Sequence, residues 1–186
     1  MLFGVPPGVV AGDVDGPAIE AALVVVPHEP AARVLAAPAT TGTVSAVYVA
    51  PAAESAMVAV PSASAVAGRG LEGDRYFDGA GTFSERGGTG RDITLVDAAA
   101  LADAGVAPAE SRRNVVVEGL DLDALIGRTF RVGEVECVGR RRCEPCAHLQ
   151  RLTRPGVLRA LVHRGGLRAD VVSGGVVRVG DAVAAV

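Results

Sequence analysis

Three cysteines fall within ten residues of one another, and the last two form the motif Cys143-Glu144-Pro145-Cys146 directly after the run Arg140–Arg142. A thiol acts as a nucleophile or a metal ligand only as the thiolate, and nearby guanidinium charge favours that form. The chain thus places its only cysteines beside its densest positive charge. This pairing predicts a reactive sulfur next to an anion-binding site.

The cysteine motif permits three interpretations. Together with Cys137 and His148, the pair Cys143 and Cys146 has the composition of a Cys₃His zinc site, but Cys137 lies in a predicted strand and no second knuckle follows. A redox dithiol would need a βαβ unit around the motif, which the β-rich pattern does not supply. The third interpretation is a single working thiolate, Cys146, at a helix start where the dipole and the arginines favour S⁻. In that case Cys137 is a buried, inert thiol.

Arginine supplies all 18 basic side chains, because the chain contains no lysine. Pyridoxal phosphate enzymes hold their cofactor as a lysine Schiff base, so this chain cannot do that chemistry by itself. Half of the arginines lie between Arg140 and Arg178, against only Glu144 and Asp170. Such a density suits bidentate capture of phosphate or carboxylate, although a solvated, arginine-rich surface would have the same composition.

Two further segments could contribute to an anion site. The loop Gly68–Gly73 has glycines interleaved with charged residues, which lets backbone N–H groups approach an anion, but it lacks the contexts of a P-loop or a dinucleotide site and could be a plain surface turn. In the segment Arg112-Arg113-Asn114, strand alternation would place Arg112 and Asn114 on one face and Arg113 on the other. The alternative for this segment is a charge pair on an edge strand.

The composition and the spacing of apolar residues predict one mainly β domain. The chain has 186 residues, 49% of them hydrophobic and few aromatic, and valine-rich runs favour strands. Strands are expected at 43–50, 57–60, 64–67, 91–96, 113–118, 129–132, 135–138, 168–173 and 176–186, with short helices at 97–104, 121–126, 146–152 and 155–163. Many short strands with glycine turns and few helices (α+β) indicate a barrel or sandwich.

Composition also limits location and partners. The net charge of −3 and the scarcity of aromatic residues argue against general nucleic-acid binding. No stretch approaches the ~20 apolar residues of a membrane span, and the N-terminus lacks the basic start of a secretory signal. Three closely spaced cysteines do not resemble a disulfide framework, which predicts a reduced, cytoplasmic setting. Residues 1–40 differ in composition and are expected to be an N-terminal extension of unknown role, ahead of a domain at 41–186.

The motifs of residues 41–186, taken in order, resemble the MOSC family, named for the C-terminal domain of molybdenum cofactor sulfurases. The matching stretches are Gly70-Leu71-Glu72-Gly73-Asp74-Arg75, Arg91-Asp92-Ile93-Thr94-Leu95, Arg112-Arg113-Asn114-Val115-Val116, Gly119-Leu120-Asp121-Leu122, Phe130-Arg131-Val132-Gly133 and Cys143-Glu144-Pro145-Cys146. The resemblance implies a β-barrel-like domain that binds molybdenum cofactor, a molybdenum held by the dithiolene of a phosphorylated pterin.

The resemblance also implies roles for particular residues. The cysteine that closes the Pro-Cys motif, here Cys146, carries the chemistry as a molybdenum ligand or as a sulfur-accepting persulfide. In amidoxime-reducing relatives an arginine and an asparagine two residues apart contact the cofactor, which matches Arg112 and Asn114, and an arginine after the glycine-rich loop matches Arg75. We add Arg91 and Arg142 to the expected cofactor-binding set.

The leading hypothesis is therefore a molybdenum protein that reduces N-hydroxylated small molecules to amines at Cys146. The chain has no ferredoxin-like Cys₄ pattern, so electrons would come from separate electron-transfer proteins. The first alternative is a sulfur carrier that accepts a persulfide on Cys146 from a cysteine desulfurase and delivers it to a cofactor or cluster. The second is a small zinc-stabilised binding domain, in which the three cysteines and His148 would matter equally for folding.

Overall fold

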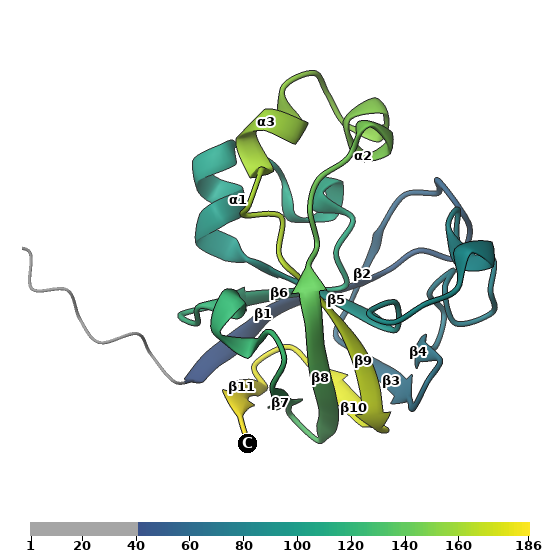
Figure 1. Cartoon of the computed structure of the whole chain (residues 1–186), viewed down its shortest axis with the longest axis vertical. Coiled ribbons are helices and arrows are strands. Elements are labelled where there is room, and N and C mark those ends of the chain that lie inside the picture. The colour runs from purple at the N-terminus through teal and green to yellow at the C-terminus, as the bar shows by residue number, and fades with distance from the viewer. Residues whose placement is uncertain (1–40) are drawn as a thin grey trace, which may run out of the picture. The chain divides into compact units, whose positions relative to one another are not determined.

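The computed structural model describes residues 41–186, and the predicted N-terminal extension, 1–40, lies outside the described residues (Figure 1). The strands are β1 Thr41–Val49, β2 Val58–Val60, β3 Ser62–Val66, β4 Gly70–Leu71, β5 Ile93–Asp97, β6 Val115–Glu118, β7 Thr129–Val132, β8 Val135–Arg142, β9 Leu167–Ser173, β10 Gly175–Arg178 and β11 Ala182–Ala185. The helices are α1 Ala98–Ala104, α2 Ala147–Leu152 and α3 Val157–Leu161. The expectation of a mainly β chain with a few short helices is confirmed.

Seven strands close into a barrel. Their order is β11-β7-β8-β9-β5-β6-β1, and β1 pairs back onto β11 through Gly42 and Val183. All of these pairs are antiparallel except β5 with β6. Closure leaves these strands without a free edge. The far end of β1 also carries β2, and β10, β3 and β4 form a separate three-stranded sheet.

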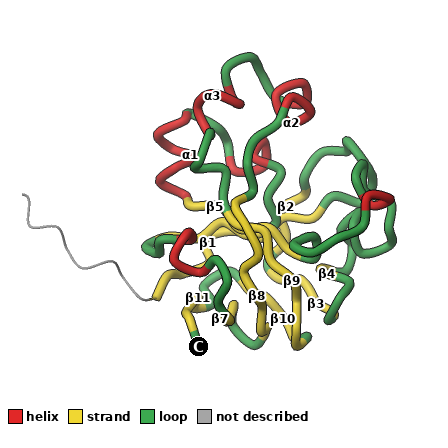
Figure 2. Tube along the Cα trace, viewed as in Figure 1, coloured by secondary structure: helices red, strands yellow, loops and turns green. Residues whose placement is uncertain are grey.

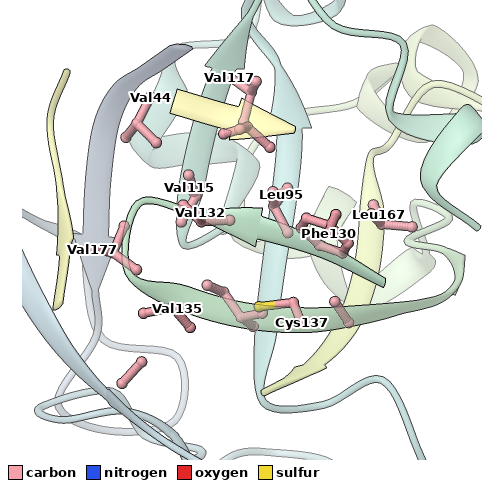
Figure 3. Close-up of a cluster of buried hydrophobic side chains, with 14 of the residues drawn as sticks. Val44, Leu95, Val115, Val117, Phe130, Val132, Val135, Cys137, Leu167 and Val177 are labelled. Atoms are coloured by element: carbon pink, nitrogen blue, oxygen red, sulfur yellow. The ribbon is translucent and has the colours of Figure 1, made fainter. Parts of the chain in front are cut away.

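The barrel interior is filled by small and branched apolar side chains. Alternate residues of β8 and β9 are buried, as expected for strands with one face on a core. Figure 3 shows Leu95, Phe130 and Cys137 from three different strands meeting inside the barrel. This interior matches the valine-rich, aromatic-poor composition.

A second apolar cluster lies under the helices, which gather on one side of the barrel (Figures 1 and 2). Val96 of β5 and Val116 of β6 are buried there against Leu101 of α1 and Leu161 of α3. Helix α1 has the predicted bounds because the Asp97 carboxylate caps it by accepting from the Ala99 N–H, and Gly105 ends it in the left-handed conformation. No helix in residues 41–186 combines the length and the hydropathy that crossing a membrane requires.

Several expected strands have different bounds in the structure, and two of these differences have a clear local cause. The strand expected at 113–118 begins at Val115, because Arg112 ends a 3₁₀ turn in the left-handed conformation (φ 58°). The strand expected at 176–186 is divided into β10 and β11, which belong to different sheets. The chain turns between them where the backbone N–H of Arg178 donates to the Asp181 carboxylate.

Candidate functional site

A cleft lies beside the point where β8 leaves the barrel. It measures about 650 Å³, counting the space open to solvent. Its walls come from the loop before β5, the residues before β6, the cysteine segment Cys143–Cys146, helix α2 and the start of β9. Segments far apart in sequence therefore form one site, and two of the three cysteines line it.

Positive charge dominates this cleft. Arg75, Arg91, Arg112 and Arg168 all line it, and only Arg75 forms an ion pair within residues 41–186, with the buried carboxylate of Asp74 at 3.1 Å. Burial lowers the pKa of the Arg112 guanidinium, and the nearby charge of Arg75 lowers it further. Arg113 lines the cleft as well, and the Glu144 carboxylate of the lining pairs with His163 at 3.1 Å. Cations that are held together in excess over carboxylates create a site that favours an anion.

Arg91 has unused hydrogen-bonding capacity in the cleft. One of its terminal nitrogens donates to the Phe83 carbonyl, but its Nε is buried and has no partner among the described residues. A buried donor without an acceptor costs about 1–3 kcal/mol, so such atoms are rare in stable folds. An acceptor atom of a bound ligand would satisfy it.

Asn114 lines the cleft, but both ends of its side-chain amide are bonded within the protein. Its Nδ2 donates to the Asp74 carboxylate at 3.1 Å and to the Tyr48 carbonyl at 3.2 Å, and its Oδ1 accepts from the N–H and hydroxyl groups of Thr94. The amide thus connects β1 and β5 to the Asp74–Arg75 pair. In this structure Asn114 positions Arg75.

The three cysteines occupy different environments. Cys146 is exposed at the N-cap of α2, Cys143 is buried in the cleft wall, and Cys137 is fully buried in the barrel. The predicted burial of Cys137 is confirmed, and burial raises the pKa of its thiol to about 12. Within residues 41–186 no three His, Cys, Asp or Glu side chains converge on a metal position, so the Cys₃His zinc site is not formed there.

Two aromatic rings form part of the cleft wall near Cys146. His148 of α2 meets Phe83 edge to face, with 5.3 Å between the ring centroids. The His148 Nδ1 lies 2.9 Å from the Arg151 guanidinium and 3.6 Å from the Glu54 carboxylate. Burial and then the charge of Arg151 lower the pKa of His148, which favours the neutral form of the ring.

The run Arg140–Arg142 is not part of this cleft's lining, so Arg142 lies apart from the other residues that were expected to bind the cofactor. The Arg142 guanidinium pairs with the Asp123 carboxylate at 2.7 Å, and Arg140 pairs with Asp170 at 2.7 Å. The end of β8 thus directs Arg140 and Arg142 to carboxylates outside the cleft lining, and Arg141 donates to the Thr89 carbonyl at 2.8 Å. The positive charge beside the cysteines comes from arginines that are distant in sequence.

The structure brings together Cys146, Arg75, Arg91, Arg112 and Asn114 of the predicted set. It adds Arg168, His148 and Phe83, which sequence reasoning did not select. A signal for Arg168 existed, because strand alternation buries Leu167 and Ala169 in the barrel and leaves Arg168 between them facing outward. Phe83 had no comparable signal, since it lies in a loop without regular spacing.

Comparison with known proteins gives one matching family, whose model, described as the MOSC domain, aligns with residues 93–184. Among solved structures, the YuaD protein from Bacillus subtilis has a TM-score of 0.63 and 20% identity, over 77% of this chain and 94% of that one. YiiM from Geobacillus stearothermophilus has a TM-score of 0.59 and 15% identity, over 78% and 75% of the two chains. YiiM from Escherichia coli has a TM-score of 0.56 and 19% identity, over 77% of this chain and 69% of that one. These proteins share the fold. A sequence comparison with curated proteins gives no match.

Proposed function

Because the chain belongs to the MOSC domain family, we propose that it binds a molybdenum cofactor in the arginine-lined cleft and reduces N-hydroxylated compounds to amines there. The observation that carries this proposal is the convergence of Arg91, Arg112 and Arg168, none of them in an ion pair within the described residues, on a cleft that also contains the exposed Cys146. The activity is proposed for the reducing cytoplasm, where Cys143 and Cys146 remain thiols.

The residues present fit a phosphorylated pterin. Guanidinium groups bind phosphate through two parallel hydrogen bonds, and the buried Nε of Arg91 lacks an acceptor. Arg112 donates to the Ser55 carbonyl at 2.7 Å through one terminal nitrogen, which fixes the guanidinium while its other N–H groups remain available. In this proposal Arg91, Arg112 and Arg168 hold the anionic end of the cofactor.

Cys146 fits the role of metal ligand. Thiolate is a soft ligand, and Cys146 is the exposed cysteine of the cleft, at the first turn of α2. Bound there, the cofactor would supply two-electron redox chemistry. The Phe83 and His148 rings form the wall beside Cys146 and would limit the access of water and the orientation of a planar substrate.

The proposed reaction consumes two electrons and two protons for each substrate molecule. The N–O bond breaks, the nitrogen gains one hydrogen in place of the hydroxyl group, and the hydroxyl takes the second proton and leaves as water. The electrons come from a separate electron-transfer protein in this proposal, and the protons come from solvent at the open side of the cleft. The amine product carries no N–O oxygen and leaves through the same opening.

Reduction of a model amidoxime tests this function. Protein made in a host that synthesises molybdenum cofactor should convert benzamidoxime to benzamidine with a reduced viologen as electron donor. Cys146→Ala should abolish turnover and leave the melting temperature unchanged, because the thiol is exposed. Equal turnover by Cys146→Ala, or none by molybdenum-loaded wild type, would contradict the proposal.

The exposure of Cys146 also supports a second function, that of a sulfur carrier. A desulfurase persulfide would transfer its outer sulfur to the Cys146 thiolate, leaving a desulfurase thiol and a Cys146 persulfide. The intact mass should then increase by one sulfur atom, the gain should disappear with dithiothreitol, and Cys146→Ser should not show it. Failure to gain sulfur from an active desulfurase excludes this function.

A further inference from the structure

Arg113 is a buried arginine whose side-chain hydrogen bonds all go to backbone carbonyls. Its side chain is 7% exposed, and it pairs with no carboxylate among residues 41–186. Its Nη1 donates to the Ser111 carbonyl at 3.0 Å, its Nη2 to the Cys143 carbonyl at 2.9 Å and its Nε to the Gly165 carbonyl at 2.8 Å. All three nitrogens of a buried guanidinium are therefore committed to fixed acceptors.

These acceptors belong to three separate segments. Ser111 lies in the turn before β6, Cys143 follows β8, and Gly165 precedes β9. Strands β8 and β9 are neighbours in the barrel, but the chain between Cys143 and Gly165 leaves it to form α2 and α3. Arg113 therefore connects the two ends of the segment that contains α2 and α3.

The cysteine segment is packed tightly at the same place. The Cys143 N–H donates to the Gly166 carbonyl at 2.6 Å. A side-chain carbon at Gly165 would lie 2.4 Å from the Cys143 carbonyl oxygen and 3.0 Å from a ring carbon of Pro145. Only glycine leaves room for this contact, so the position of the segment is determined from two sides, by Gly165 and by Arg113.

We propose that Arg113 is a positioning residue that fixes the segment Cys143–Cys146 and thereby places the Cys146 thiol in the cleft. A planar guanidinium can serve three acceptors at fixed angles, whereas a lysine ammonium supplies a point charge on a flexible stem. Loss of the three guanidinium hydrogen bonds leaves buried carbonyls unsatisfied and favours local opening of the segment. The effect on molybdenum binding rests on the proposed function, but the effect on the segment does not.

The alkylation rates of the three cysteines test this proposal, because Cys146 lies at the start of α2, Cys143 in the segment that Arg113 holds and Cys137 in the barrel interior. In the wild type, alkylation with iodoacetamide followed by peptide mass spectrometry should modify Cys146 readily and both Cys143 and Cys137 slowly. In Arg113→Lys, Cys143 should react about 10- to 100-fold faster, as loss of hydrogen bonds to a charged group predicts, while Cys137 stays protected. Gly165→Ala should give the same pattern by displacing the Cys143 carbonyl. Arg164→Lys, which changes a surface arginine paired with Asp103, is the matched control and should behave as wild type.

Two outcomes would overturn the proposal. If Cys143 and Cys137 become reactive together in both test variants, Arg113 supports the whole barrel. If neither becomes reactive, the guanidinium does not hold the segment. Molybdenum content, measured on the same samples, separates this inference from the proposed function: selective Cys143 exposure in a protein whose wild type holds no molybdenum would preserve the positioning role and reject the cofactor.

Discussion

The barrel interior and the cleft place cysteine in opposite environments. Cys137 is enclosed by apolar side chains from neighbouring strands, and burial raises its pKa to about 12. Cys146, nine positions further along, is exposed beside a cleft whose Arg91, Arg112 and Arg168 form no ion pair among residues 41–186. Neighbouring side chains, rather than the cysteine motif alone, determine which thiol can react.

The barrel and the cleft also differ in backbone regularity and in how completely their buried polar atoms are hydrogen-bonded. The barrel residues lie in regular strands with apolar packing, whereas the cleft contains an unpartnered Arg91 Nε and a left-handed Arg112. Each such feature costs about 1–3 kcal/mol, and features of this kind collect at functional sites. The regular barrel provides the stability that allows the cleft to retain them.

The largest expected effect is on the barrel. Phe130→Ala removes the largest fully buried side chain and should lower the free energy of unfolding by about 3–5 kcal/mol, since the closed barrel cannot collapse around the cavity. Chemical denaturation measures this change. A loss below about 1 kcal/mol, the size expected of a surface change, would show that the interior is not the main source of stability.

A smaller effect is expected from the buried thiol at high pH. The folded state keeps Cys137 protonated up to a pKa of about 12, whereas the unfolded thiol loses its proton near its usual value, so between these values the folded state binds more protons. Stability should therefore fall as pH rises above ~9, by up to about 1.4 kcal/mol per pH unit, and Cys137→Ala should remove this part of the decline. If the free energy of unfolding falls in parallel with pH for wild type and Cys137→Ala, the decline does not come from Cys137.

The smallest effect on stability is expected from substituting one arginine inside the cleft and one outside it, and these two variants differ instead in anion binding. Arg112→Ala should weaken binding of inorganic pyrophosphate, a probe for the cofactor phosphate, by about 10- to 100-fold. Arg142→Ala should leave binding unchanged, because Arg142 pairs with Asp123 outside the cleft. Titration calorimetry on both variants makes the comparison, and equal losses would show that the anion binds elsewhere.

Much of the cleft could be predicted from the sequence, because Cys146, Arg75, Arg91 and Arg112 lie in short motifs with recognisable order. The sequence could not show that Arg142 lies outside the lining of this cleft, since closeness in sequence to the cysteines does not place a side chain at the end of β8 in the same cleft. Strand alternation also failed for Arg113, because the left-handed Arg112 interrupts it just before β6.

The role of Arg113 depends on contacts that no local pattern records. Its acceptors are 2, 30 and 52 positions away in sequence. They come together only after β8 and β9 have paired in the closed barrel. Long-range pairing of this kind follows from the whole fold, so the sequence could suggest an edge-strand charge for this residue but not the segment that it holds.

The central claim concerns Cys146, and elemental analysis tests it most directly. Molybdenum, zinc and iron per chain should be measured for wild type, Cys146→Ala and Cys137→Ala, all made in a cofactor-competent host and each checked to be folded at the temperature of purification. The account predicts molybdenum in the wild type and in Cys137→Ala, with a strong decrease in Cys146→Ala. Equal molybdenum in all three proteins, or none in the wild type, would contradict it.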